Sequence, residues 1–199
     1  YNAAKALQGI GEVTVVAPDR DLSGVASAMT LMSVVHIHEN PPIYEGVKTF
    51  SVEGTPADCV VLATEMLAKK PFDLLISGIN QGSNLGLDVL LSGTLGGAFQ
   101  GYFRNIPSIA ISVAALSNVQ YEAAASTAKC LAQLIKLNGS GMQMLLNVNL
   151  PNHPLHLVKG LERTILGPRA FMETVEQGHD GRKPHYWIKR NKSVSNTVD

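Results

Sequence analysis

Residues 72–86 read FDLLISGINQGSNLG and carry the clearest signal of secondary structure in the chain. Its first part, residues 72–77, is a largely apolar run that is typical of a buried β-strand. Its second part is a polar loop in which Gly78, Gly82 and Gly86 allow positive φ and close approach of the backbone. A helix is expected next, over residues 93–104. Strand, polar loop and helix in this order are the unit from which α/β sheets are built.

The same alternation continues on both sides of this unit. Further strands are expected over residues 12–17, 33–38, 47–52, 108–114 and 144–150, and further helices over residues 1–7, 56–69 and 121–137. The helix that follows Thr55 has a well-marked start, because Thr55 suits the N-cap, Pro56 the first helical position and Asp58 a capping box. We therefore predict a three-layer, Rossmann-like α/β core over residues 1–151 with a mostly parallel sheet.

After residue 151 the sequence changes in character, because charged residues and histidines become more frequent and helical periodicity disappears. Strands are expected over residues 157–166 and 185–189, so residues 152–199 are predicted to form a β extension that serves oligomerisation. Tyr186 and Trp187 either pack in this extension or an interface, or stack on a base. A strand normally precedes the first helix of an α/β protein, and we expect it to lie before Tyr1.

The composition excludes several classes of function. Sixteen basic and 16 acidic side chains balance each other, whereas a protein that neutralises many phosphates usually has a basic excess, so DNA binding is not expected. Apolar runs such as residues 109–116 are far shorter than the ~18 residues of a membrane span.

The two cysteines, Cys59 and Cys130, make no disulfide framework, which favours a cytoplasmic location. Cys59 is either a thiol of lowered pKa at a helix start or a small buried side chain.

Two loops are expected at the carboxyl ends of the strands, where open α/β sheets bind ligands. The first loop, residues 17–24, offers two carboxylates and the hydroxyl of Ser23 beside a glycine. Its alternative interpretation is an ordinary polar surface loop. Nearby, His36 and His38 would share one face of a strand, where they either ligate a metal or belong to the solvated side of an edge strand.

The second loop, residues 77–86, leads into Ser92, Gly93 and Thr94 at the start of a helix. The N–H groups of a helix N-terminus make a site for an anion. Neither the Gly-Lys-Ser/Thr of a Walker loop nor the Gly-x-Gly-x-x-Gly of a dinucleotide turn occurs here. The alternative interpretation is a glycine-rich turn followed by an ordinary N-cap.

Five blocks of the sequence together resemble the ordered signature of the SurE family, the survival-protein phosphatases of the 5′-nucleotidase type. In chain order they are Ala17-Pro18-Asp19-Arg20 with Ser23-Gly24; Gly54-Thr55-Pro56-Ala57-Asp58-Cys59; Ser77-Gly78-Ile79-Asn80 with Gly82, Asn84 and Gly86; Ser92-Gly93-Thr94; and Leu146-Asn147-Val148-Asn149 with Pro151. The resemblance extends from Tyr1 to about Pro151 and is looser beyond.

This resemblance implies a phosphomonoesterase that hydrolyses nucleoside 5′-monophosphates and binds one divalent ion, Mg²⁺ or Mn²⁺. Ser23 and Asn80 match two of the family's metal ligands. The other two, an aspartate pair in an Asn-Asp-Asp-Gly motif, would lie before Tyr1, and Asp19 and Asp21 do not replace them. The catalytic residues are therefore not identified within this sequence.

The family resemblance and the second loop also imply where substrate would bind. Asn84, Ser92, Gly93 and Thr94 would hold the oxygens of the substrate phosphate, and the protein would be a homodimer or homotetramer. Two other functions remain open at this point: a non-catalytic α/β module that binds a nucleotide or an anion, and an assembly module that acts through the β extension. An Asp-Asp pair before Tyr1 would decide for the enzyme.

Overall fold

The computed structural model describes residues 1–139, 143–169 and 171–193 of the chain. These residues form two compact units. The larger unit comprises residues 1–84 and 91–161, and the smaller unit comprises residues 85–90 together with the chain from Glu162 on. Within the described ranges, no helix is both long enough and apolar enough to cross a membrane.

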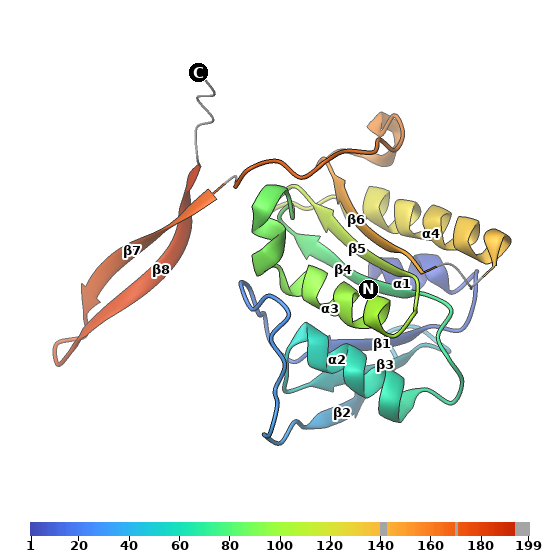
Figure 1. Ribbon diagram of the computed structural model, residues 1–199, viewed down its shortest axis with the longest axis horizontal. Helices are drawn as coiled ribbons and strands as arrows, with labels where there is room; N and C mark the ends of the chain where they lie inside the picture. Colours follow the sequence, from blue (N-terminus) through green and yellow to red (C-terminus); the bar gives the residue numbers. More distant parts are fainter. Residues whose placement is uncertain (140–142, 170, 194–199) are drawn as a thin grey trace. The chain divides into compact units, whose positions relative to one another are not determined.

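The described strands of the larger unit form two sheets of three strands each (Figure 1). In the first sheet, β1 (Thr14–Pro18) pairs in parallel with β3 (Lys48–Val52), and β2 (Ile37–Asn40) pairs antiparallel with the other edge of β3. The second sheet is parallel throughout, in the order β4 (Leu75–Gln81), β5 (Ser108–Val113) and β6 (Leu145–Leu150). The mostly parallel character that the sequence predicts is confirmed.

Helices cover both faces of these strands. The α-helices are α1 (Asn2–Leu7), α2 (Pro56–Leu62), α3 (Gly93–Phe103) and α4 (Tyr121–Asn138). Helix α2 continues as a π turn, η1 (Ala63–Leu67). The described 3₁₀ turns are η2 (Gly86–Leu91) and η3 (Leu155–Leu157). Helices α2 and α3 pack on each other, with α2 on β1 and α3 on β4 and β5 (Figure 1). Helix α4 also packs on β5. Because every residue of β5 is buried, α3 and α4 cover opposite faces, as expected for three layers.

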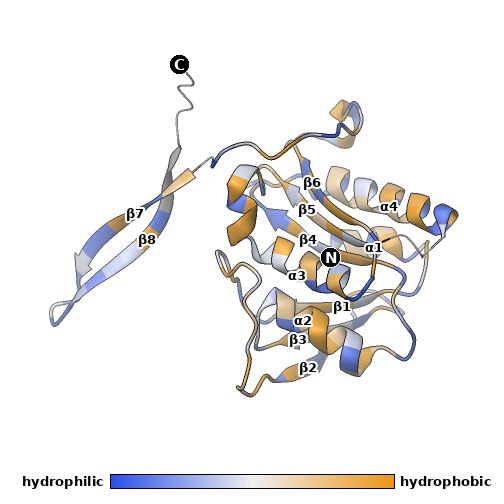
Figure 2. Cartoon of the chain, in the orientation of Figure 1, coloured by the Kyte–Doolittle hydropathy of each residue, from blue (hydrophilic) through white to orange (hydrophobic). Residues whose placement is uncertain are grey.

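The core of the larger unit lies between β5 and α4. Ile109, Ile111 and Val113 of β5 are fully buried against Ala124 and Ala128 of α4. Each buried isoleucine stabilises the fold by about 1.5–3 kcal/mol relative to an exposed one. Figure 2 shows apolar residues alternating with polar ones along α4, the pattern of a helix that buries a single face.

The strands β1 and β4 each leave one edge unpaired. Among the described residues, β1 pairs with β3 alone and β4 pairs with β5 alone. Their residues are mostly half-buried, whereas β5, which has a strand on each side, is buried throughout. The single sheet expected from the sequence is therefore divided in two, because no described strand bridges the edges of β1 and β4.

The β extension is an antiparallel hairpin of β7 (Phe171–His179) and β8 (Pro184–Ser193). Asp180 forms its turn, since Oδ1 accepts hydrogen bonds from the N–H groups of Arg182 and Lys183, both at 2.8 Å. The strand predicted over residues 185–189 lies within β8. The strand predicted over residues 157–166 was wrong, because this segment is mostly exposed and pairs with no described strand; its first residue ends the short η3 turn.

Candidate functional site

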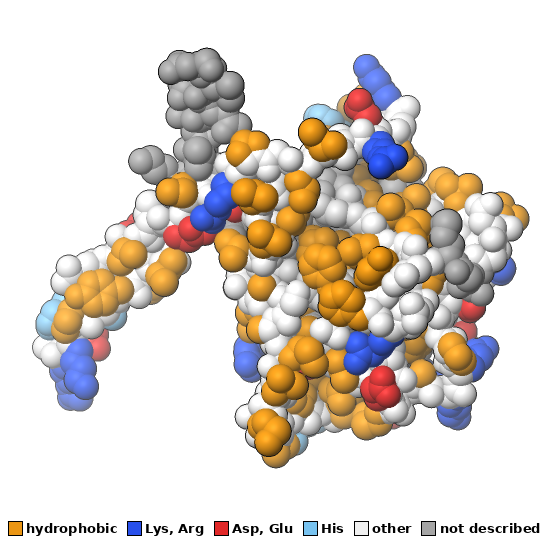
Figure 3. All heavy atoms as spheres, in the orientation of Figure 1, with side chains coloured by type: hydrophobic (Ala, Val, Ile, Leu, Met, Phe, Trp, Pro, Cys, Tyr) orange, Lys and Arg blue, Asp and Glu red, His pale blue; other side chains and the backbone are white. Residues whose placement is uncertain are grey.

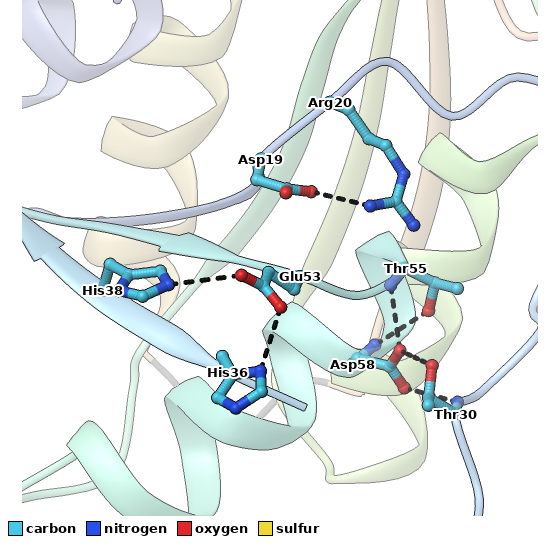
Figure 4. Close-up of polar contacts among 8 residues, drawn as sticks. All are labelled: Asp19, Arg20, Thr30, His36, His38, Glu53, Thr55 and Asp58. Carbon is cyan, nitrogen blue, oxygen red and sulfur yellow. Dashed lines mark hydrogen bonds and ion pairs between the residues drawn. The ribbon is translucent and has the colours of Figure 1, made fainter. Parts of the chain in front are cut away.

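The loop that follows β1 begins as a short continuation of the sheet. The Asp19 N–H donates to the Val52 carbonyl at 2.9 Å, and the Asp19 carboxylate pairs with Arg20 at 3.5 Å (Figure 4). An open hollow of about 490 Å³ lies over the loop; its lining is Ala17, Pro18, Asp19, Arg20, Asp21, Leu22 and Pro56. Ser23, a predicted metal ligand, is exposed just beyond this lining.

Asp58, in the first turn of α2, forms hydrogen bonds with Thr30 farther along this loop. The Asp58 carboxylate accepts hydrogen bonds from the Thr55 N–H at 2.9 Å, the Thr30 N–H at 2.9 Å and the Thr30 hydroxyl at 2.6 Å (Figure 4). The Thr55 hydroxyl also accepts from the Asp58 N–H, so the predicted capping box is confirmed. Burial raises the pKa of Asp58, but the hydrogen bonds from Thr30 and Thr55 outweigh burial and hold this pKa below its ordinary value.

Three glycines let the loop after β1 and the strand β4 come close to α3. A Cβ added at Gly93 would lie 2.9 Å from Val25 and 3.5 Å from the Leu22 carbonyl oxygen. A Cβ at Gly97 would lie 2.9 Å from Ser77, and one at Gly101 would lie 2.9 Å from Leu75. Helix α3 therefore runs antiparallel to β4.

This direction decides where the predicted ligands meet. The N-terminus of α3 lies at the end of β4 that carries Asn80, and Leu22, the neighbour of Ser23, lies beside Gly93 at the same helix end. The two segments that hold Ser23 and Asn80 thus reach one end of α3. Direct coordination of one ion by Ser23 and Asn80 stays a prediction.

Asn80 itself is oriented by the loop that follows it. Its Nδ2 donates to the carbonyls of Gln81 at 3.0 Å and Gly82 at 2.7 Å. In the described part of the chain no hydrogen bond engages Oδ1, so the amide oxygen is the atom available to a cation. Gly78 permits this path, because its φ is +127° and a Cβ there would lie 2.3 Å from the Ile111 carbonyl oxygen.

Asn84 is held by residues of β5 and β6. Its Nδ2 donates to the buried Ser112 hydroxyl at 2.7 Å, and its backbone N–H donates to Oδ1 of Asn149 at 2.7 Å. Asn84 is 8% exposed, so most of its side chain faces the protein. The sequence had not indicated Ser112 or Asn149 as contacts of this loop, although Asn147 and Asn149, spaced two apart on a strand, were the available signal.

The start of α3 has the features of an anion site. Ser92 is the N-cap, and its Oγ accepts from the Leu95 N–H at 3.2 Å. The N–H groups of Gly93 and Thr94 lie in the first turn, where a helix has no internal acceptor for them. These N–H groups and the helix dipole favour a negative charge. Contact of Ser92, Gly93, Thr94 and Asn84 with a phosphate stays a prediction.

The candidate ligands of the site are oxygen atoms, which a hard divalent ion prefers, but they carry no negative charge. The Ser23 hydroxyl and the Asn80 amide oxygen are ligands of the type that Mg²⁺ and Mn²⁺ take, but both are neutral. Among the described residues, no three His, Cys, Asp or Glu side chains lie close enough to hold a metal ion.

The histidine pair and Cys59, the other candidates from the sequence, have surroundings that fit the structural interpretation of each. His36 and His38 both contact Glu53, at 2.9 and 3.5 Å, on the solvated edge at β2 (Figure 4). Hydrogen bonds from these two histidines lower the pKa of Glu53. Cys59 is buried, and burial followed by the charge of Asp58 raises its pKa to about 12. Both observations agree with the interpretation of Cys59 as a small buried side chain.

Comparisons with known proteins identify the family and the fold of the chain. The family described as survival protein SurE matches residues 1–173. A 5′-nucleotidase SurE of Dehalococcoides mccartyi (strain ATCC BAA-2266 / KCTC 15142 / 195) is 44% identical over 190 residues, which are 94% of this chain and 72% of that relative. A 5′-nucleotidase SurE of Legionella pneumophila (strain Lens) is 41% identical over 186 residues, or 93% of this chain and 72% of the relative.

A solved structure gives the same result at the level of the fold. The crystal structure of the SurE protein from Aquifex aeolicus is similar with a TM-score of 0.77 at 38% sequence identity, and the match covers 96% of this chain and 77% of that chain. The family match, the identity to these relatives and the shared fold extend over nearly the whole of the described sequence. The chain belongs to the SurE family.

Proposed function

We propose that the protein is a divalent-metal-dependent hydrolase of phosphoric monoesters, in the 5′-nucleotidase class, whose substrates are nucleoside 5′-monophosphates. One observation carries the proposal. The segments that bear Ser23 and Asn80 reach the N-terminus of α3, whose first N–H groups have no acceptor within the helix and can bind an anion. The relatives named 5′-nucleotidase SurE support it. They do not favour the alternatives of a non-catalytic anion-binding module or an assembly module.

In this proposal the chain's own residues bind and orient the phosphate. The N–H groups of Gly93 and Thr94 and the Ser92 hydroxyl would donate to its oxygens. The second Nδ2 hydrogen of Asn84, the one that is not donated to Ser112, would contribute from the neighbouring loop. Ser23 and Asn80 would each offer a neutral oxygen to a divalent ion, Mg²⁺ or Mn²⁺. Such an ion supplies the full positive charge that phosphoryl transfer needs and that these donors lack.

The anionic ligands of that ion are the remaining part of the proposal. A strand inserted between β1 and β4 would pair with both open edges and would bury their half-exposed residues. The carboxyl end of such a parallel strand would lie beside Ser23 and Asn80. We place the aspartate pair of the family motif there.

Three further attributes belong to the same proposal. The hairpin β7–β8 would form the interface of a homodimer or homotetramer, because four of its apolar side chains, Val175, Tyr186, Trp187 and Ile188, are 52–77% exposed. Figure 3 shows hydrophobic side chains on the surface of the hairpin. The division into a catalytic core over residues 1–151 and an oligomerisation extension over 152–199 follows from this role. A cytoplasmic location is supported by two free cysteines, of which Cys130 is exposed.

The test is phosphate release from adenosine 5′-monophosphate by the natural full-length protein. Release is expected with Mg²⁺ or Mn²⁺, and it should fall to background after exhaustive chelation and return when metal is added back. Undiminished activity after chelation would refute the metal dependence. Absence of release with a panel of phosphomonoesters and both metals would refute the proposed reaction.

A further inference from the structure

The segment Leu146-Asn147-Val148-Asn149 of β6 places two amides on one face of the second sheet. Residues two apart on a strand share a face, and Leu146, Val148 and Leu150 pack with the core on the other. Asn149 is the register partner of Ser112 on β5. Both amides therefore lie on the face of the sheet that α3 covers, next to the side chain that holds Asn84.

The two amides bind both backbone polar groups of one residue, Asn84. Asn149 Oδ1 accepts from the Asn84 N–H at 2.7 Å, and Asn149 Nδ2 donates to the Asn84 carbonyl at 3.1 Å. Asn147 Nδ2 donates to the same carbonyl at 2.8 Å. Asn149 Nδ2 also donates to Asn147 Oδ1 at 3.1 Å, so that each asparagine orients the other. With Ser112 on its side chain, Asn84 is held at the ends of β5 and β6.

We propose that Asn147 and Asn149 are positioning residues for the phosphate site, an amide clamp that holds the loop of Gly82, Ser83 and Asn84 in its binding conformation. This inference rests on the proposed function and names a role for residues that the reaction itself does not use. When hydrogen-bond donors are already held in position, the protein loses little conformational entropy as the anion binds. A mobile loop must first be ordered, and this ordering weakens binding. Loss of the clamp therefore weakens phosphate binding more than it slows the bound substrate.

The same chemistry occurs once more nearby and supplies a matched control. Asn152 Oδ1 accepts from the Gln120 N–H at 2.7 Å, and its Nδ2 donates to the Asn118 carbonyl at 3.2 Å. This amide clamps the segment before α4 instead of the loop of Asn84. Asn149→Leu and Asn152→Leu each replace an amide by an apolar side chain of similar size, and each removes two hydrogen bonds to backbone.

The experiment uses the natural full-length protein and compares Asn149→Leu, Asn147→Leu and Asn152→Leu with the wild type. The rate of hydrogen exchange at the Asn84 amide measures whether the clamp is formed. The inhibition constant of inorganic phosphate, together with kcat and KM, measures how the clamp affects phosphate binding and turnover. In Asn149→Leu we expect exchange at Asn84 and both KM and the phosphate inhibition constant to rise by about tenfold, with a smaller change in kcat. Asn147→Leu, which loses one bond to Asn84, should show the same changes at smaller size. Asn152→Leu should leave all three within about twofold.

Each other outcome is decisive. Unchanged exchange at Asn84 in folded Asn149→Leu overturns the clamp, and faster exchange with unchanged phosphate affinity overturns the positioning role. Equal losses of phosphate affinity in Asn149→Leu and Asn152→Leu mean a general structural effect and also overturn it. If the wild type shows no turnover, the proposed function fails separately, and the clamp is judged by the dissociation constants of inorganic phosphate. Wild-type protein that binds no phosphate overturns it.

Discussion

Thr30 and Asp58 are joined by two hydrogen bonds, from the Thr30 N–H to Oδ1 at 2.9 Å and from the Thr30 hydroxyl to Oδ2 at 2.6 Å. Asp58 is 6% exposed and belongs to the first turn of α2, whereas Thr30 lies in the long loop that follows β1. One carboxylate thus caps a helix and also anchors the loop that leads from Ser23. Stability of the fold and order of the candidate metal site are coupled through this side chain.

Asp58→Asn is expected to lower the free energy of unfolding by about 1–3 kcal/mol at neutral pH, because it removes an ionised acceptor of buried hydrogen bonds. The pKa of Asp58 is lower in the folded protein than its ordinary value of 3.8. The ionised carboxylate therefore stabilises the fold above pH 3.8, and this contribution is lost as the pH falls through the folded-state pKa. Denaturant titrations from pH 7 to 2.5 should show the difference between wild type and variant shrinking with acid. The exposed Asp73→Asn serves as control, and a difference that stays constant with pH would contradict the expectation.

Gly78→Ala is expected to destabilise the protein and to disturb the loop that orients Asn80. The Cβ would lie 2.3 Å from the Ile111 carbonyl oxygen, and φ at Gly78 is +127°. Gly139→Ala separates the two effects, because Gly139 has a φ of +85° and open space around it. The control should lose about 1 kcal/mol in thermal or denaturant unfolding, the cost of positive φ alone. Gly78→Ala should lose clearly more, and equal losses would mean that the close approach to Ile111 is unimportant.

Asn80→Ala is expected to lower kcat/KM of the full-length enzyme by about tenfold at limiting Mn²⁺, since it removes one ligand oxygen from the proposed metal site. Excess Mn²⁺ should restore part of the activity, because weaker binding is offset by concentration. Asn138→Ala, at the last residue of α4, is the matched control and should behave as wild type. A loss of activity that no Mn²⁺ concentration changes would argue against a ligand role for Asn80.

A double change of Trp187→Ser and Ile188→Ser in the hairpin is expected to shift full-length protein to smaller oligomers. These side chains are 52% and 77% exposed in the single chain, and burying such surface between copies is the expected source of association. Leu137→Ser, an equally apolar change at a residue 83% exposed in α4, should not alter the assembly. Analytical ultracentrifugation at micromolar concentration gives the masses. Wild-type protein that is already monomeric would reject the proposed interface.

Elements whose signals are local were predictable from the sequence. Thr55, Pro56 and Asp58 mark the start of α2, and the structure forms their capping box because all the partners lie within one helical turn. The strand β5 was predictable because an apolar run is buried on both faces. In the hairpin, β7 was missed since its residues are mostly exposed, and a strand without a buried face shows no period-two alternation. Residues 157–166 have apolar side chains but pair with no strand of the described ranges, so they form no ladder.

For residues 1–151 the sequence predicted the order of strands and helices, the polar loops after β1 and β4, and the family to which the motifs belong. Two features appear only in the folded chain: Asn147 and Asn149 hold Asn84, and the described strands divide into two sheets with open edges at β1 and β4. The difference arises from distance along the chain. A capping box joins residues three apart, whereas the bonds between Asn84 and the amides of β6 span 63 and 65 residues. Such contacts arise when β4, β5 and β6 align in parallel, and no local propensity encodes that register.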